Sequence, residues 1–229
     1  TYYTTIPPGG KEVFAQHQDF LTCYHVKGVY LMYRGIKYGE AEAMKIDFNP
    51  FPELETERLF LRKLKEEEDM YDVFNMRKDP SMHEYTDTRP DEKLEDSIDY
   101  IRRMNQGVDE NKWIVWGLQD KGSGRIIGTI SIWNIYPDEE KAELGFGIVP
   151  EFRGRGIMTE GLREVVDYSF REANFKKLEA FTEEGNSKSI SVLQRCGFIE
   201  YRRVIDQSPF DGKEYKMVVY KRTHPNLLD

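Results

Sequence analysis

One turn constrains this chain more than any other feature, because it joins an apolar run to a helical pattern through glycines and arginines. The turn covers residues 149–161, with the sequence Val-Pro-Glu-Phe-Arg-Gly-Arg-Gly-Ile-Met-Thr-Glu-Gly. Residues 144–149 form the apolar run before it. The apolar residues after it recur at helical spacing: Leu162, Val165, Val166 and Phe170. The sequence therefore predicts a strand, a glycine turn and a helix, in that order.

The predicted helix begins just after Gly156, and its first backbone N–H groups have no partner within the helix. These groups carry the positive end of the helix dipole, so they attract an anion. Gly154 and Gly156 let the backbone approach a ligand closely, and Arg153 and Arg155 add positive charge. We expect this turn to bind a pyrophosphate.

Two kinds of phosphate-binding turn fit the spacing poorly. A P-loop needs Gly-Lys-Ser/Thr after its second glycine, whereas Ile-Met-Thr follows Gly156. A dinucleotide-binding turn needs Gly-x-Gly-x-x-Gly, and Thr159 occupies its third glycine position, although Glu179 lies where the ribose-binding acid is expected. That second reading also predicts a series of βα units, while one strand, one short helix and a hairpin follow this turn.

A third kind of turn has the pattern Arg-x-x-Gly-x-Gly/Ala, which Arg153 and Gly156 match and from which Met158 departs. It is the coenzyme A loop of the Gcn5-related N-acetyltransferases (GNAT). Four further segments resemble the same superfamily in the correct order: residues 54–62, 127–130, 142–146 and 186–198. The chain therefore resembles the RimJ/RimL-type branch, the ribosomal-protein N-acetyltransferases, which often carry Met-Thr-Glu after the loop glycine. The resemblance covers Glu57 to about Arg222.

The expected fold class is α+β, with a GNAT-type mixed, largely antiparallel sheet flanked by helices and one βαβ crossover at the coenzyme A site. Apolar runs predict strands at residues 58–64, 113–118, 126–135, 142–149, 177–182, 201–205 and 215–220. Helical spacing predicts a helix around Met70 to Phe74 that ends at Asp79-Pro80, and a second one with Pro90 in its first turn. A further helix is expected at residues 187–195.

The first 52 residues are expected to form an N-terminal extension of unknown role, followed by the acetyltransferase domain at residues 53–229. The prolines at positions 50 and 52 give the clearest boundary signal, since they favour an extended connector. The extension is rich in aromatic residues, which argues for an ordered segment. A short helix is expected at residues 13–21 and a strand at 29–32. His17, Cys23 and His25 lack a fourth ligand nearby, so we expect ordinary packing and no metal.

The net charge of −8 is concentrated in residues 66–110, which contain 15 acidic and 6 basic residues. Nucleic acid is an unfavourable partner for such a chain because phosphate binding needs positive charge. Two readings of the acidic segment remain open. Its helices expose solvated acidic faces, or they form an acidic rim that attracts a cationic amine to the acceptor cleft.

The composition also bounds the compartment and the partners. No run approaches the ~18 apolar residues that span a bilayer, and the N-terminus lacks a signal-peptide pattern, so no membrane is expected. Because the sequence begins at Thr1 and not at Met, a leader before it is expected. Two cysteines are too few for a disulfide framework, which favours the cytoplasm. A monomer or a homodimer is expected.

The resemblance implies that the chain transfers an acetyl group from acetyl-CoA, as co-substrate, to a primary amine. The acceptor is a protein N-terminal α-amine or a small cationic amine, attacking directly through a tetrahedral intermediate. The attacking amine must be neutral. A lysine-type amine of pKa ~10.4 is neutral in about one molecule in 2,500 at pH 7, and an α-amine of pKa ~7.8 in roughly one in seven. A general base is therefore more necessary for a cationic amine than for an N-terminus.

The family pattern also implies the site residues. Backbone N–H groups of Phe146 or Ile148 would stabilise the oxyanion. Glu143 is the candidate base, directly or through a water, against the alternative of a surface carboxylate. Asn186 would bind the pantetheine or the attacking group, or cap its helix. The expected cofactor-binding residues are Phe146, Ile148, Arg153, Gly154, Arg155, Gly156, Met158, Thr159, Asn186 and Ser189.

One departure affects the expected mechanism. Many GNAT enzymes have a tyrosine that protonates the leaving thiolate, and Leu193 occupies that position here. Ser191 or Tyr201 could replace it, but we favour unassisted departure, because a thiolate of pKa ~8.5 is a fair leaving group. The loss also leaves open an alternative function, an acetyl-CoA-binding sensor or regulatory module without catalysis.

Overall fold

The computed structural model describes residues 13–14, 21–26, 29–34, 46–86, 88–207, 212 and 214–227. The chain divides into two compact units, residues 1–42 and residues 43–229. The division falls before the predicted boundary at residue 52, and Ile46, Phe48 and Phe51 pack against the core of the larger unit. The role of the N-terminal extension stays a prediction.

The smaller unit contains a three-stranded antiparallel sheet. Its strands are β1 (Val13–Phe14), β2 (Leu21–Val26) and β3 (Val29–Arg34), in this order. The strand expected at residues 29–32 is confirmed. The helix expected at residues 13–21 is wrong at both described ends, which are strands, and residues 15–20, including His17, lie outside the described residues.

The larger unit has one mixed sheet of eight strands in the order β10-β11-β9-β8-β7-β6-β5-β4. The strands are β4 (Leu54–Glu55), β5 (Leu59–Arg62), β6 (Ile114–Asp120), β7 (Ile126–Tyr136), β8 (Lys141–Ile148), β9 (Lys177–Glu183), β10 (Ile199–Gln207) and β11 (Glu214–Thr223). Among these described strands only β8 and β9 pair in parallel. The predicted largely antiparallel sheet with one βαβ crossover is therefore confirmed.

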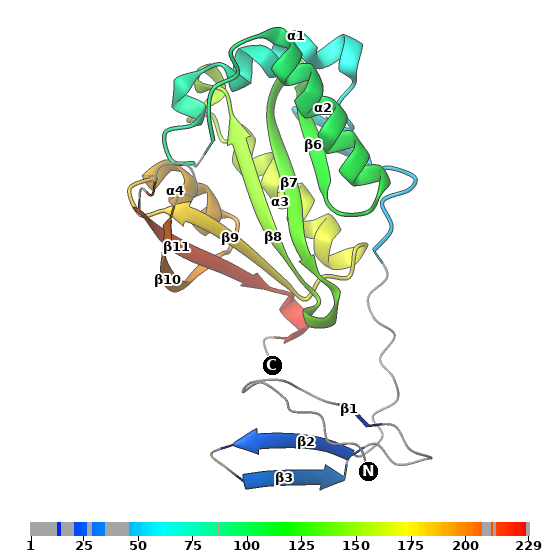
Figure 1. Cartoon of the computed structure of the whole chain (residues 1–229). Helices are drawn as coiled ribbons and strands as arrows, with labels where there is room; N and C mark the ends of the chain where they lie inside the picture. Colours follow the sequence, from blue (N-terminus) through cyan, green and yellow to red (C-terminus); the bar gives the residue numbers. More distant parts are fainter. Residues whose placement is uncertain are drawn as a thin grey trace. The chain divides into compact units, whose positions relative to one another are not determined.

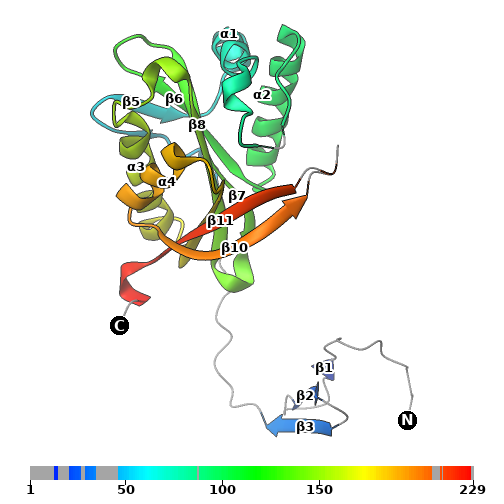
Figure 2. The same cartoon turned by 90° about the vertical axis from the view of Figure 1, so that its left-hand side faces the viewer.

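Helices cover both faces of this sheet. They are α1 (Glu66–Arg77), α2 (Leu94–Asp109), α3 (Ile157–Arg171) and α4 (Ser187–Arg195). The short 3₁₀ turns are η1 (Pro80–Met82), η2 (Pro137–Glu139), η3 (Pro150–Phe152) and η4 (Pro225–Leu227). In Figure 1 the sheet lies between these layers, and Figure 2 shows α3 and α4 on one face and α1 and α2 on the other. None of the described helices is both long and apolar enough to cross a membrane.

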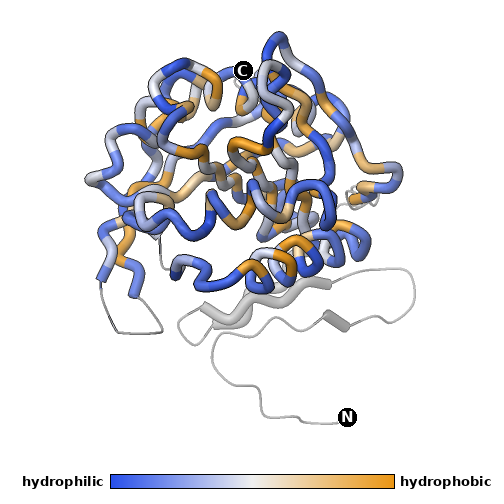
Figure 3. The backbone as a smooth tube through the Cα atoms, turned by 90° about the horizontal axis from the view of Figure 1, so that it is seen from above, coloured by the Kyte–Doolittle hydropathy of each residue, from blue (hydrophilic) through white to orange (hydrophobic). Residues whose placement is uncertain are grey.

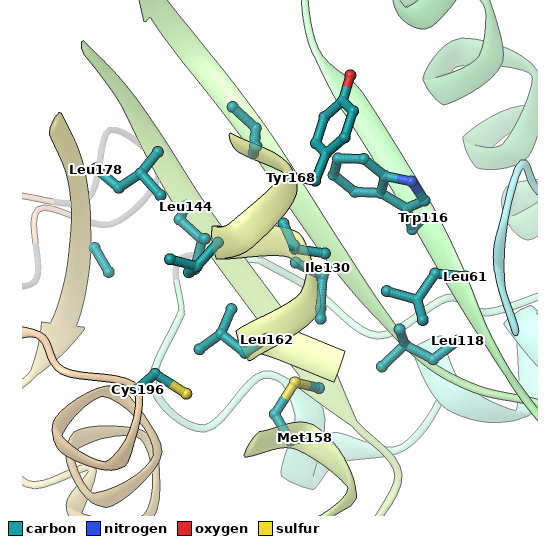
Figure 4. Packing of buried hydrophobic residues seen from close by; sticks show 14 of the residues in the cluster. Leu61, Trp116, Leu118, Ile130, Leu144, Met158, Leu162, Tyr168, Leu178 and Cys196 are labelled. Carbon is teal, nitrogen blue, oxygen red and sulfur yellow. The ribbon is translucent and has the colours of Figure 1, made fainter. Parts of the chain in front are cut away.

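Helix α3 provides the centre of the core. Its apolar stripe packs on the inward face of the sheet, and Leu162 lies among Ile130, Leu144 and Leu178, all buried (Figure 4). The hydropathy colouring of Figure 3 shows apolar segments alternating with polar ones along the helices, as amphipathic elements require. Burial of each such side chain contributes ~1.5–3 kcal/mol to the free energy of folding, so α3 is firmly packed at the end of β8.

Several acidic side chains of helices α1 and α2 form ion pairs with arginines. Asp69 pairs with Arg62 at 2.8 Å and Glu66 with Arg102 at 2.6 Å, while Asp72 contacts Arg125 at 3.1 Å. Part of the acidic segment is therefore an ion-pair network, and both readings of the segment stay predictions.

Helix α2 begins later than expected. Its first residue is Leu94, because the Asp96 carboxylate accepts the backbone N–H groups of Glu92 and Lys93 and so caps the helix there. Pro90 consequently precedes the helix and does not form part of its first turn.

Strands β8 and β9 separate soon after they pair. In the described structure their parallel register covers only Lys141–Glu143 against Lys177–Glu179. Beyond Glu143 the two strands diverge, and helix α3 starts at the far end of β8. This divergence positions the candidate site.

Candidate active site

A cavity of about 450 Å³ lies at the end of β8, beyond the part of that strand that pairs with β9. Its wall is formed by the end of β8, the turn before α3, the first turn of α3, one side of α4 with its N-cap, and residues 81, 82 and 84–86. Nine of the ten residues expected to bind the cofactor line this cavity: Phe146, Ile148, Arg153, Gly154, Gly156, Met158, Thr159, Asn186 and Ser189. The fold thus brings together motifs that are far apart in the sequence.

The glycine turn has the backbone that its sequence requires. Gly154 and Gly156 both have φ of +75°, in the left-handed region that favours glycine. The first intrahelical bond of α3 runs from the N–H of Glu160 to the carbonyl of Gly156, at 3.0 Å. The N–H groups of residues 157–159 precede that bond and have no intrahelical acceptor, so they form an anion-binding helix start beside the cavity.

Arg153 connects three segments around the cavity. Its Nε donates to the carbonyl of Ile148 at 3.0 Å, and its Nη2 approaches the carbonyl of Ser81 at 3.4 Å and Sδ of Met82 at 3.1 Å. The guanidinium therefore ties the glycine turn to β8 and to η1. A contact of Arg153 with phosphate stays a prediction.

Arg155 lies outside the cavity wall that the described residues form. Its guanidinium carbon is 5.4 Å from the ring centre of Phe152, and its carbonyl accepts a bond from Nη1 of Arg58 at 3.0 Å. Its predicted role as a cofactor contact has no support from this position.

Arg58 and Glu160 brace the start of α3, a role that sequence reasoning missed although both lie in quoted motifs. The Arg58 guanidinium and the Glu160 carboxylate are 2.6 Å apart, and Thr56 donates to the same carboxylate at 2.6 Å. Burial alone would raise the pKa of Glu160, but the bonds from Thr56 and Arg58 outweigh it and lower that pKa. The pair fixes the helix end whose N–H groups face the cavity.

The strand edge beside the cavity presents free N–H groups. The N–H of Val149 donates to the carbonyl of Ile127 on β7 at 2.9 Å, and the β7–β8 register is regular from there back to Glu143. Because alternate N–H groups of an antiparallel strand point to opposite sides, those of Phe146 and Ile148 point away from β7, toward the diverging β9. These are the two predicted oxyanion donors.

Asn186 and Ser189 begin helix α4 at the opposite wall. The side-chain oxygen of Asn186 accepts the backbone N–H of Ser189 at 3.1 Å, so Asn186 is a helix N-cap. Its side chain also lines the cavity, which leaves the amide NH₂ for a ligand.

Glu143 is the last residue of β8 that pairs with β9, and it lies outside the cavity wall formed by the described residues. One of its oxygens accepts a bond from Nδ2 of Asn134 at 3.1 Å. Burial raises the pKa of Glu143 above its usual range, and the charge of Glu179 adds to the rise, against opposing contributions from Asn134, Lys141 and Arg202. Glu143 and Phe146 are three positions apart, roughly 10 Å along a strand, so a water is needed between base and attacking amine at that point.

The structure places the three positions that were considered for protonating the departing thiolate. Leu193 is fully buried in the core, so no phenol reaches the cavity from that position of α4. Ser191 lines the cavity, whereas Tyr201 is 51% exposed on β10, with Nζ of Lys221 4.1 Å from its ring centre.

Tyr85 is a cavity residue that no sequence signal indicated. A hydrogen bond to Glu84 raises its pKa, and burial and the charges of Glu84 and Glu183 act in the same direction. It comes from the irregular segment after η1, whose residues have no helical or strand periodicity. Metal-ligating groups of three or more His, Cys, Asp or Glu are not found among the described residues.

Comparison with known proteins gives a consistent result. A family model described as acetyltransferase (GNAT) domain matches residues 58–199. An uncharacterised N-acetyltransferase, YoaA of Bacillus subtilis, is 28% identical over 173 residues, covering 73% of this chain and 97% of that protein.

Solved structures with the same fold include two acetyltransferases. One is the ribosomal-protein-S5-alanine acetyltransferase of Vibrio fischeri, with a TM-score of 0.68 and 20% identity over 76% of this chain and 98% of that one. The other is the spermidine N-acetyltransferase of Vibrio cholerae in complex with CoA and spermine, with a TM-score of 0.64 and 21% identity over 76% of this chain and 100% of that one.

Proposed function

The chain belongs to the GNAT acetyltransferase family and is an N-acetyltransferase, and on this premise we propose that it transfers an acetyl group from acetyl-CoA to a primary amine by direct attack. The observation that carries the proposal is the cavity itself. It runs from the anion-binding start of α3 to the free edge of β8, so that a phosphate group and a thioester can be bound at its two ends.

Acetyl-CoA binds in this proposal with its pyrophosphate at the N–H groups of residues 156–159. The pantetheine then lies in the gap between β8 and β9, with Asn186 and Ser189 on its other side. This orientation is supported by the lining of the cavity, and the Vibrio cholerae relative is in complex with CoA. It requires no metal.

The chemistry then depends on the edge of β8. An N–H group of Phe146 or Ile148 donates to the carbonyl oxygen as the tetrahedral intermediate forms, and a donor placed in this way contributes ~10²–10³ in rate. Collapse of the intermediate releases CoA as a thiolate. With Leu193 in place of the family's tyrosine, that thiolate leaves unassisted.

Glu143 acts as the general base in this proposal, removing a proton from the amine through a water. Its half-buried position and its raised pKa bring it nearer the operating pH than an exposed glutamate. Because a base must be deprotonated to act, activity should rise with pH through the pKa of Glu143 and be lost below it.

The acceptor is an N-terminal α-amine or a small cationic amine. Relatives named for ribosomal-protein alanine and for spermidine keep both classes open. Glu84 at the cavity wall supplies a negative charge for a cationic acceptor. We further propose a cytoplasmic protein, monomeric or homodimeric, that binds neither nucleic acid nor membranes.

The test is thiol release from acetyl-CoA across a panel of amines, with the natural chain and Glu143→Gln. We expect turnover with one amine class, and a loss of kcat by ~10²-fold or more in the variant at unchanged cofactor affinity. Turnover that survives in the variant would remove Glu143 as the base. Tight binding of acetyl-CoA without release by any amine, including peptide N-termini and polyamines, would favour the non-catalytic module that the missing tyrosine suggests.

A further inference from the structure

Glu179 is a buried carboxylate that the mechanism above does not use. It lies on β9 and is only 5% exposed. Its two oxygens accept bonds from Nη1 and Nη2 of Arg202, at 3.3 and 3.1 Å. A buried charge needs such a partner, and the two-pronged geometry is the one that a guanidinium forms best with a carboxylate.

The ion pair lies directly beside the proposed base. Glu143 and Glu179 are register partners in the short parallel ladder between β8 and β9. Adjacent strands are about 4.8 Å apart, and paired residues project on the same face of the sheet. Two carboxylates are therefore neighbours, and Arg202 holds one of them.

The surroundings of Glu143 can be enumerated by element. Asn134 of β7 donates to it, Lys141 of its own strand and Arg202 of β10 act on it as positive charges, and Glu179 of β9 acts as a negative one. Lys141 binds Glu139 at 2.9 Å and also acts as a positive charge on Glu179, but the hydrogen bonds to Glu179 come from Arg202. Among these groups, Arg202 is the one that forms an ion pair with Glu179, the carboxylate next to Glu143.

Arg202 is held in place by more than its ion pair. Its guanidinium carbon lies 5.1 Å from the ring centre of Tyr201 and 5.7 Å from that of Phe181. Aromatic faces at this distance attract a guanidinium and restrict its orientation. The fork thus stays directed at Glu179 although Arg202 comes from the edge strand, beyond β11 in the sheet order.

We propose that Arg202 is a positioning residue for the acetyl-transfer reaction, and that it keeps Glu143 available as a base by neutralising the neighbouring Glu179. The proposal rests on the role of Glu143 proposed above. Without Arg202, repulsion between the two adjacent carboxylates would favour a proton on one of them, and a protonated Glu143 accepts none from the amine. With Arg202 in place, the repulsion is reduced and Glu143 stays ionised.

The two members of the ion pair should therefore have opposite effects on Glu143. In Glu179→Gln a negative charge is lost, so the pKa of Glu143 should fall by about one pH unit. In Arg202→Met the compensating charge is lost, so that pKa should rise by about the same amount. Arg202→Lys keeps the charge and should lie close to the natural chain.

The measurement is a pH titration of side-chain carboxyl groups by ¹³C NMR on the full chain, with the Glu143 signal assigned from its absence in Glu143→Gln. Arg203→Met is the matched control. Arg203 is the next residue of the same strand and carries the same charge, but it binds Glu200 and Glu184. We expect no shift of Glu143 in this control. Shifts of one sign in both Glu179→Gln and Arg202→Met, or none in either, would overturn the proposal.

Kinetics separate this inference from the proposed base. The acidic limb of the kcat/KM profile should move down in pH for Glu179→Gln and up for Arg202→Met, as the carboxyl titration does. If Glu143→Gln keeps an unchanged acidic limb, the base is wrong while the coupling seen by NMR stands. If that limb disappears in Glu143→Gln but neither partner variant moves it, the base is right and the role of Arg202 is refuted.

Discussion

At the scale of single residues, the chemistry of the proposed site depends in part on side chains that no sequence motif marks. Glu143 could be selected from its motif, but the carboxylate beside it could not, because Glu179 and Arg202 become neighbours only through strand pairing. Glu179 instead suggested a ribose-binding acid, and its burial against Arg202 gives it no such role here. Contacts of this kind depend on register, which one sequence does not specify.

Tyr85 provides a prediction at the residue scale. If the thiolate leaves unassisted, Tyr85→Phe should reduce kcat by less than about threefold, since general acid catalysis normally contributes ~10²–10⁴-fold. The check is kcat at saturating acetyl-CoA across pH. Ser191→Ala, which removes another hydroxyl of the cavity wall, serves as the parallel variant. A loss of about 10²-fold confined to Tyr85→Phe would instead identify the phenol as the acid.

At the scale of elements, periodicity predicted most strands and helices of the larger unit, because their apolar stripes face one core. It failed where no stripe exists. The segment after η1 that covers the cavity is irregular, and the start of α2 depends on a single cap by Asp96. The divergence of β8 and β9 was not predictable either, since nothing in the composition of the two strands marks where pairing stops.

The glycine turn provides a prediction at the element scale. Gly156→Ala places a Cβ at φ of +75°, which costs roughly 1–2 kcal/mol and should displace the first N–H groups of α3. Acetyl-CoA affinity, measured by calorimetry, should fall together with the free energy of unfolding.

Gly124→Ala is the matched control for that variant. Gly124 has φ of +72° in the turn between β6 and β7, with open space around an added Cβ, and it lies apart from the cavity wall. It should lose a similar stability while its acetyl-CoA affinity stays unchanged. Equal loss of affinity in both variants would mean that strain, and not the helix start, weakens binding.

At the scale of the whole molecule, the larger unit should respond to the cofactor as one body, because the cavity wall is drawn from both sides of the sheet. Acetyl-CoA at about 100 times its Kd should stabilise this unit by about 2.7 kcal/mol. For a unit of this size that corresponds to a rise of roughly 5–10 °C in its Tm, measurable by calorimetry. NAD should give no rise in Tm. Protection by NAD alone would instead support a dinucleotide-binding function.

The short ladder between β8 and β9 has a consequence for the mechanics of this unit. Strands β4 to β8 form one hydrogen-bonded block and strands β9 to β11 another. In the described structure the ladder at Lys141–Glu143 joins them edge to edge, together with the bonds that the carbonyl of Glu140 accepts from the N–H groups of Lys176 and Lys177. This short ladder is the hinge axis between the two blocks, and α3 packs against the sheet beside it. A small rotation of one block about this axis would change the width of the cavity while every strand pairing within each block stays intact.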